Sequence, residues 1–142
     1  NAVDKGAKKM IDENKFIFPK EHKNYLVPQV LTSVNHDMDF MTEETFGPCV
    51  GIMKVKDEHE AIKLMNDSPY GLTASIWTKD LEIAEKIGNQ VQTGTFYMNR
   101  CDYLDPALSW TGVKETGKGC SLSEIAYEKL TSPKSFHLRK EQ

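Results

Sequence analysis

The chain has 142 residues, of which 39% are hydrophobic and 27% charged, a balance typical of one soluble globular domain. Its formal net charge is −3, and its lysines and arginines form no basic stripe, which argues against a nucleic-acid partner. No apolar run approaches the ~20 residues that a membrane-spanning helix needs, so no membrane partner is expected.

The N-terminus has neither an initiator Met nor a charged-then-apolar signal pattern. We therefore expect the chain to begin inside a longer reading frame. The three cysteines, Cys49, Cys101 and Cys120, are odd in number and form no CxxC pair, so a secreted disulfide framework is not expected. A reducing, cytoplasmic setting is predicted, with each cysteine structural or incidental.

The N-terminal residues 1–24 are rich in lysine, and an amphipathic turn at Ala7–Ile11 predicts a partial helical segment. A short apolar run follows at Tyr25–Leu31 and contains Pro28. Because proline has no N–H to donate to a sheet ladder, this run is predicted to be an edge or end strand.

The middle of the chain alternates between strand and helix patterns. Asp57 and Glu60 form a capping-box signature that predicts one helix start, and Asp80 is predicted to cap a second helix. In that second helix Leu81, Ala84, Ile87 and Val91 share one face. Since each connection is long enough for a helical crossover, parallel pairing is expected. The strands are predicted at Cys49–Val55, Leu72–Thr78 and Gly94–Asn99.

The C-terminal part is irregular and glycine-rich from Arg100 to Gly119. A second capping box, Ser121-x-x-Glu124, predicts a short helix that ends near Tyr127. Lys134–Arg139 is predicted to be a final strand. The fold class that follows is α/β, with a mainly parallel sheet and crossover helices.

Two kinds of site are not expected. The stretch Gly112–Gly119 nearly matches the phosphate-binding loop GxxxxGK[ST], but Gly119 replaces the hydroxyl residue and no strand leads directly into the loop. The four histidines are scattered, with no HExxH motif and no nearby Cys pair, so no metal site is predicted.

The run Glu43-Glu44-Thr45-Phe46-Gly47-Pro48 resembles the EExFGP motif of the NAD(P)-dependent aldehyde dehydrogenase superfamily. The segments around it, from about residue 25 to the end, also follow the order of that family. The resemblance implies the C-terminal part of the family's catalytic domain over residues 25–130. It also implies an oligomerisation strand and tail over residues 131–142, and hence a homodimer or homotetramer.

The resemblance further implies that Glu44 and Phe46 contact NAD or NADP. A carboxylate only accepts hydrogen bonds, so Glu44 is suited to accept one from each of the two hydroxyl groups of the nicotinamide ribose. Phe46 would pack beside the same ribose and ring. In an extended segment, residues two apart face the same side, so the two could act together. The alternative is that Glu43 and Glu44 are surface acids and that Phe46 is part of the core.

By the same resemblance, the irregular segment borders the substrate tunnel for a small aldehyde. Trp110-Thr111-Gly112 stands where many members of the family have Phe-Gly-Gly, which leaves pocket size and substrate preference open. Trp110 could equally be a core residue. The residues expected at the tunnel are Asn99, Asp102, Leu104 and Trp110.

Enzymes of that family form a thioester on a Cys, which with its Glu partner lies well upstream of EExFGP. Only 43 residues precede Glu44 here, so the resemblance implies a fragment of an oxidoreductase without its nucleophile, inactive alone. The alternative is a non-catalytic α/β binding or assembly module that retains the family's C-terminal half.

Overall fold

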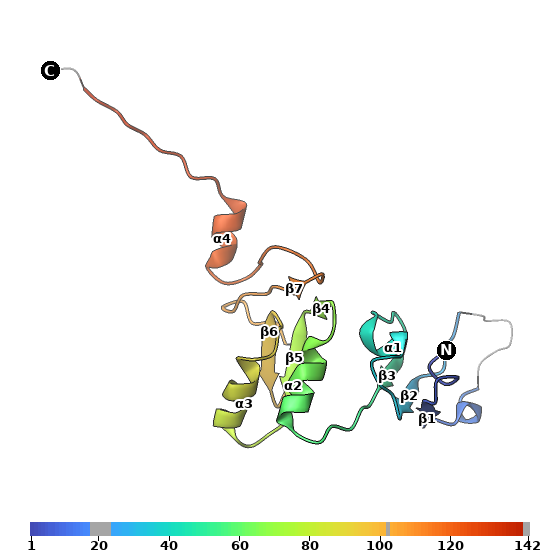
Figure 1. The fold of residues 1–142 in the computed structure, drawn as a ribbon. Coiled ribbons are helices and arrows are strands. Elements are labelled where there is room, and N and C mark those ends of the chain that lie inside the picture. The colour runs from blue at the N-terminus through green and yellow to red at the C-terminus, as the bar shows by residue number, and fades with distance from the viewer. Residues whose placement is uncertain (18–23, 102, 141–142) are drawn as a thin grey trace. The chain divides into compact units, whose positions relative to one another are not determined.

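The computed structural model describes residues 1–17, 24–101 and 103–140 (Figure 1). They form two compact units, Asn1–Pro69 and Tyr70–Gln142. Short helices and strands alternate in both units, and both contain a parallel strand pair, which agrees with the predicted α/β class. None of the helices in this described part is long and apolar enough to cross a membrane.

The first unit contains a three-stranded sheet in the order β1-β2-β3. Strand β1 (Lys8–Lys9) pairs antiparallel with β2 (Gln29–Thr32), which pairs in parallel with β3 (Cys49–Gly51). The prediction of an edge strand at Tyr25–Leu31 is therefore wrong, because β2 is the central strand. Pro28 lies just before β2, where its missing N–H removes no ladder hydrogen bond.

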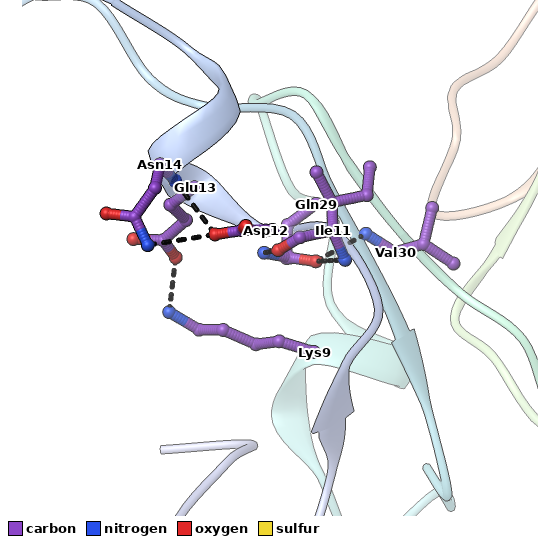
Figure 2. Close-up of polar contacts among 7 residues, drawn as sticks. All are labelled: Lys9, Ile11, Asp12, Glu13, Asn14, Gln29 and Val30. Carbon is purple, nitrogen blue, oxygen red and sulfur yellow. Dashed lines mark hydrogen bonds and ion pairs between the residues drawn. The ribbon is translucent and has the colours of Figure 1, made fainter.

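The helical turn predicted at Ala7–Ile11 is also wrong, because this stretch contains β1. The helical residues nearby form a 3-10 turn, η1 (Glu13–Lys15). The side chain of Gln29 binds the backbone of Ile11, just beyond β1 (Figure 2). Ile11 N donates to Gln29 Oε1 at 2.9 Å, and Gln29 Nε2 donates to Ile11 O at 3.1 Å, so a side-chain amide prolongs the β1–β2 ladder.

An ion pair joins β1 to η1 in the same region (Figure 2). Lys9 Nζ lies 2.6 Å from Glu13 Oε1, and this hydrogen bond and the charge of Lys9 lower the pKa of the Glu13 carboxyl. Both side chains are about half exposed, so solvent screens the pair and it contributes little to stability.

The core of the first unit lies around Met38, which is only 1% exposed. Met38 is the N-cap of α1 (Asp39–Thr42), and Phe40 and Met41 of this helix pack against the core. At Gly51 a Cβ atom would meet the Met41 sulfur and would lie 3.1 Å from the Phe40 ring. Helix α1 and strand β3 are thus closely packed, and this packing fixes both ends of the segment that connects them. The buried core residues are Ala7, Leu31, Val34 and Met38.

Helix α2 (Glu58–Asn66) begins where the capping box predicted. The Asp57 side chain accepts from Glu60 N at 2.8 Å, which satisfies one N–H at the helix start. Glu60 Oε2 in turn accepts from Lys56 N at 2.8 Å. At the other end, His36 Nδ1 and Asp67 Oδ2 lie 2.8 Å apart and join the helix end to the loop before α1.

The second unit contains a parallel pair, β5 (Thr73–Ile76) and β6 (Thr95–Met98). Helix α3 (Leu81–Gly88) is the crossover between them, and its predicted N-cap Asp80 accepts from Ile83 N at 3.0 Å. The predicted parallel pairing is confirmed for these two strands, whereas β3 pairs with β2. Ala84 and Val91 of the predicted apolar face are buried, while Leu81 is 68% exposed.

In the second unit, Gly71 of β4 (Tyr70–Gly71) and Gly94 just before β6 lie against the Gly-rich segment. Strand β4 pairs antiparallel with β7 (Val113–Lys114), and Gly71 N donates to Thr116 Oγ1 at 2.7 Å. Gly94 N donates to Gly71 O at 3.1 Å. A Cβ atom at Gly94 would overlap the carbonyl oxygen of Thr111, so only glycine lets these backbones approach.

The capping box predicted at Ser121 is wrong. Ser121 forms an isolated bridge with Trp110, with hydrogen bonds of 2.7 and 2.9 Å between their backbones. Leu122 and Ser123 have positive φ values of 63° and 56°, which no helix allows. Helix α4 (Ile125–Leu130) therefore starts later, after Glu124, and without a side-chain cap.

The predicted final strand is not formed within the chain. Residues 131–140 run as an exposed trace beyond α4 (Figure 1). Phe136 is 72% and Leu138 86% exposed. A strand requires a hydrogen-bonded neighbour, and none of the described residues pairs with Lys134–Arg139.

Candidate cofactor and substrate site

Residues 43–48 form the loop between α1 and β3, which is called the motif loop below. Glu43 is extended, with φ −101° and ψ 150°, and its N–H donates to Asp39 O at 2.8 Å. Gly47 N then donates to Thr45 O at 3.0 Å, which closes a three-residue turn around Phe46. The backbone is thus extended at Glu43, and the chain turns at Phe46, so the prediction that Glu44 and Phe46 face one side of an extended segment stays a prediction.

The motif loop is anchored at both ends. Its first N–H is bound to α1, as above, and Pro48 O accepts from Gln29 N at 2.9 Å, which continues the parallel ladder of β2 and β3. Cys49 N donates to Gly47 O at 2.8 Å and tightens the entry to β3. The loop is therefore held by backbone bonds that do not involve its side chains.

Glu43, Glu44 and Phe46 all point into solvent as exposed side chains. Phe46 is 92% exposed, so the alternative in which it is a core residue is wrong. Full burial of a Phe side chain stabilises a folded protein by about 1.5–3 kcal/mol, and the exposed Phe46 ring does not contribute this stabilisation. On this anchored loop, the nearly bare ring of Phe46 can pack against a ligand, and the carboxylate of Glu44 can accept hydrogen bonds from the ligand's hydroxyl groups.

Asn99 lies at the carboxyl ends of β5 and β6, but its amide is already bound. Asn99 Nδ2 donates to Thr78 O at 2.7 Å, and Thr78 N donates to Asn99 Oδ1 at 3.0 Å. Its φ is 55°, a left-handed conformation that Asn tolerates well. Asn99 therefore fastens the two strand ends together and turns the chain into the irregular segment.

The other predicted tunnel residues are spread along that segment. Leu104 is 55% exposed, and Asp102 lies outside the described residues. Trp110 is half-buried and lines a pocket of about 440 Å³ with Leu72 and the segment 116–121. Neither Asn99 nor Leu104 lines that pocket.

The structure also shows a feature that the sequence reasoning did not single out. The guanidinium carbon of Arg100 lies 3.8 Å from the centre of the Tyr103 ring. The only signal in the sequence was the position of Arg100 directly after a predicted strand. Among the described residues, no group of three or more His, Cys, Asp or Glu side chains could hold a metal ion.

Comparison with known families places these features in context. The family described as "Aldehyde dehydrogenase family" matches residues 1–136. The chain belongs to the aldehyde dehydrogenase family. An aldehyde dehydrogenase of Emericella nidulans is 38% identical over 115 residues, which are 81% of this chain and 23% of the relative. A succinate-semialdehyde dehydrogenase [NADP(+)] of Deinococcus radiodurans is 34% identical over 134 residues, 94% of this chain and 28% of the relative.

Solved structures of aldehyde dehydrogenases share the fold. The indole-3-acetaldehyde dehydrogenase of P. syringae, in complex with NAD+, has a TM-score of 0.81 and 30% identity over 90% of this chain and 26% of its own. The NAD-dependent aldehyde dehydrogenase of Sinorhizobium meliloti has a TM-score of 0.80 and 28% identity over 90% of this chain and 25% of its own. The chain thus spans about a quarter of the length of the aldehyde dehydrogenases that it matches.

Proposed function

We propose that this chain forms the C-terminal part of the catalytic domain of an enzyme that oxidises an aldehyde to a carboxylic acid with NAD or NADP. Family membership supports aldehyde oxidation with a nicotinamide cofactor in general. The observation that carries the proposal to this chain's own residues is the motif loop. There the bare ring of Phe46 stands beside Glu44 on a backbone fixed at both ends.

Glu44 is proposed to accept hydrogen bonds from the two hydroxyls of the nicotinamide ribose. Phe46 is proposed to pack against that ribose and ring and so to recover the apolar burial that it lacks in the chain alone. The bound cofactor supplies the hydride acceptor. Its identity stays NAD or NADP, because relatives of both kinds are similar to this chain.

The irregular segment is proposed to border the aldehyde site. Asp102, Leu104 and Trp110 are its candidate wall residues, and Asn99 supports them by joining the strand ends through Thr78. Exposed Leu104 offers an apolar surface, and the half-buried indole of Trp110 limits the width of its pocket. Asp102, Leu104 and Trp110 would thus touch the substrate, whereas Asn99 would hold the wall in position.

The thioester-forming Cys is proposed to lie outside this chain, so the purified 142-residue chain is expected to oxidise no aldehyde. The exposed tail, with Phe136 and Leu138 two residues apart, is proposed to pair with a partner subunit's sheet in a cytoplasmic homodimer or homotetramer. An absorbance increase at the NADH band with an aldehyde and NAD would contradict the assignment of the nucleophile.

Saturation-transfer NMR with NAD tests the cofactor role on the chain itself. We expect weak, millimolar binding with the strongest transfer to the nicotinamide and ribose protons, because the chain holds only part of the site. Phe46→Ala should abolish transfer to the nicotinamide protons. Glu44→Gln keeps the size of the side chain but loses the charge, and should weaken binding about tenfold.

Glu43→Gln is the matched control, since Glu43 is the neighbouring acid and is also exposed. It should leave the transfer unchanged. Equal losses in Glu43→Gln and Glu44→Gln would mean that the loop attracts NAD by charge alone. Transfer confined to the adenine protons would contradict the proposed role and would favour the non-catalytic module.

A further inference from the structure

A pocket in the first unit brings together sulfur atoms and one imidazole from separate elements. It has a volume of about 400 Å³, and none of the residues 43–48 of the motif loop lines it. Three of the chain's six methionines do line it: one lies in α1, one shortly after β3 and one in α2. The side chains with donor atoms in this thioether pocket are those of His36, Met41, Met53, Met65 and Ser68.

His36 has the surroundings of a metal ligand. Its Nδ1 atom lies 2.8 Å from Oδ2 of Asp67, the C-cap residue of α2. A carboxylate at this distance keeps the proton of the neutral ring on Nδ1 and leaves the lone pair of Nε2 for a metal ion. The side chain of His36 is only 16% exposed, and its ring makes no other hydrogen bond to the described residues.

The methionine side chains lie on walls that the core of the unit supports. The Met41 sulfur lies against Gly51, another residue of the pocket, because a Cβ atom at Gly51 would meet it. Met41 and Met53 are partly buried and pack against the core. Met65 is 40% exposed, so a small ion can reach the pocket from solvent. The pocket therefore offers polarisable sulfur on a supported surface.

The donor atoms of the pocket select the kind of ion. Thioether sulfur and imidazole nitrogen suit Cu(I), whereas Mg²⁺ and Ca²⁺ require carboxylate or carbonyl oxygens. None of the described residues that line the pocket has an acidic side chain. The carboxylate of Asp67, bound to the far side of the His36 ring, balances one positive charge. These features favour a soft monovalent cation over a divalent one.

We infer that the thioether pocket binds Cu(I), with Nε2 of His36 and the sulfurs of Met41, Met53 and Met65 as its ligands. Each ligand donates one lone pair, and the oxidation state of the ion does not change. Asp67 is a positioning residue that acts through His36. The site goes beyond the proposed function and does not depend on it. No sequence spacing predicted it, because its ligands lie on separate elements that only the fold brings together.

Ag(I) is the probe, because it has the filled d shell and the soft character of Cu(I) and does not oxidise in air. Thiolates would compete for it, so the titration uses the chain with Cys49→Ser, Cys101→Ser and Cys120→Ser, none of which breaks a disulfide. The 13C-labelled methionine methyl resonances are followed in chloride-free buffer. We expect saturable shifts for the three methionines of the pocket, with a micromolar dissociation constant, and no shift for Met10 or Met98.

The wild-type chain keeps the test independent of the cysteine substitutions. Once its three thiols are saturated, further Ag(I) should shift the same methionine methyl resonances. Zn(II) is the control ion, because it binds imidazole but takes its sulfur ligands from thiolates and not from thioethers. It should leave the methyl resonances of the pocket unchanged.

Variants separate the pocket from scattered thioethers. Met53→Leu removes one sulfur at similar volume and should weaken Ag(I) binding about tenfold. Met10→Leu is the matched control, since Met10 is 61% exposed and lies outside the pocket, and it should leave binding unchanged. His36→Gln should weaken binding about a hundredfold, and Asp67→Asn, which keeps an acceptor without the charge, about tenfold.

The 15N resonances of the His36 ring test the role given to Asp67. The tautomer with its proton on Nδ1 should predominate in the wild type and should lose that preference in Asp67→Asn, which a merely structural role would not cause. A shift at Met10 equal to those in the pocket, or a His36→Gln chain that binds Ag(I) as tightly as the wild type, would overturn the inference. So would an equal response to Zn(II), or equal weakening in Met10→Leu and Met53→Leu.

Discussion

Gly94→Ala is expected to lower the free energy of unfolding of the second unit by about 3 kcal/mol. The added Cβ would overlap the carbonyl oxygen of Thr111 and would lie 3.1 Å from Gly112 N. Both neighbours are backbone atoms, so no side-chain rotation can relieve the overlap. Relief would require the irregular segment to move away from β6, which would also strain the bond from Gly94 N to Gly71 O.

Urea unfolding followed by tryptophan fluorescence measures this loss, because both tryptophans, Trp77 and Trp110, belong to the second unit. Gly47→Ala is the control, followed by circular dichroism. The nearest atom to its added Cβ is Thr45 Cγ2 at 3.9 Å, an ordinary contact, so a change within about 0.5 kcal/mol is expected. A Gly94→Ala chain as stable as Gly47→Ala would contradict the packing at this junction.

Met38→Ala should destabilise the first unit by about 2–4 kcal/mol. Among the described residues, Met38 is the largest side chain that is fully buried, and it belongs to the core cluster that includes Leu31 of β2. Truncation leaves a cavity that the rigid sheet can close only in part. Because α1 leads directly into the motif loop, the NAD contact of Phe46 should weaken along with stability.

Hydrogen exchange of the Ile52 amide, which donates to Leu31 O at 2.8 Å, reports this core directly. Exchange there should accelerate by about thirtyfold or more in Met38→Ala. Met38→Leu conserves the volume and should cost less than about 1.5 kcal/mol. Equal exchange in the two variants would show that Met38 does not support the sheet.

The elements that were predicted well depend on neighbours in the chain. Asp57 and Asp80 cap their helices because an N-cap bond reaches only three residues ahead. Strands β5 and β6 pair in parallel because α3 is long enough to cross over between them. The resemblance of the EExFGP run to its family is likewise a property of the sequence alone, and the family match confirms it.

The wrong predictions arise where a contact with a residue distant in the sequence overrides the local conformational preference. Ser121 has the residues of a capping box, but two backbone bonds to Trp110 hold it in a bridge. Ala7–Ile11 has a helical pattern, but the amide of Gln29, far along the chain, binds both backbone groups of Ile11. One tertiary contact of this kind outweighs the few tenths of a kcal/mol by which local propensities differ.

For the candidate site, the sequence by itself determined which residues are proposed to contact the cofactor: a carboxylate and an aromatic ring in one short motif, within a family order of segments. The tertiary structure alone decided how they are presented. It exposes Phe46 on a turn anchored by α1 and β3, commits the amide of Asn99 to Thr78, and stacks Arg100 on Tyr103. The bond from Gln29 N to Pro48 O at the end of the turn and the bonds between Asn99 and Thr78 join segments far apart in the chain, which no local pattern encodes.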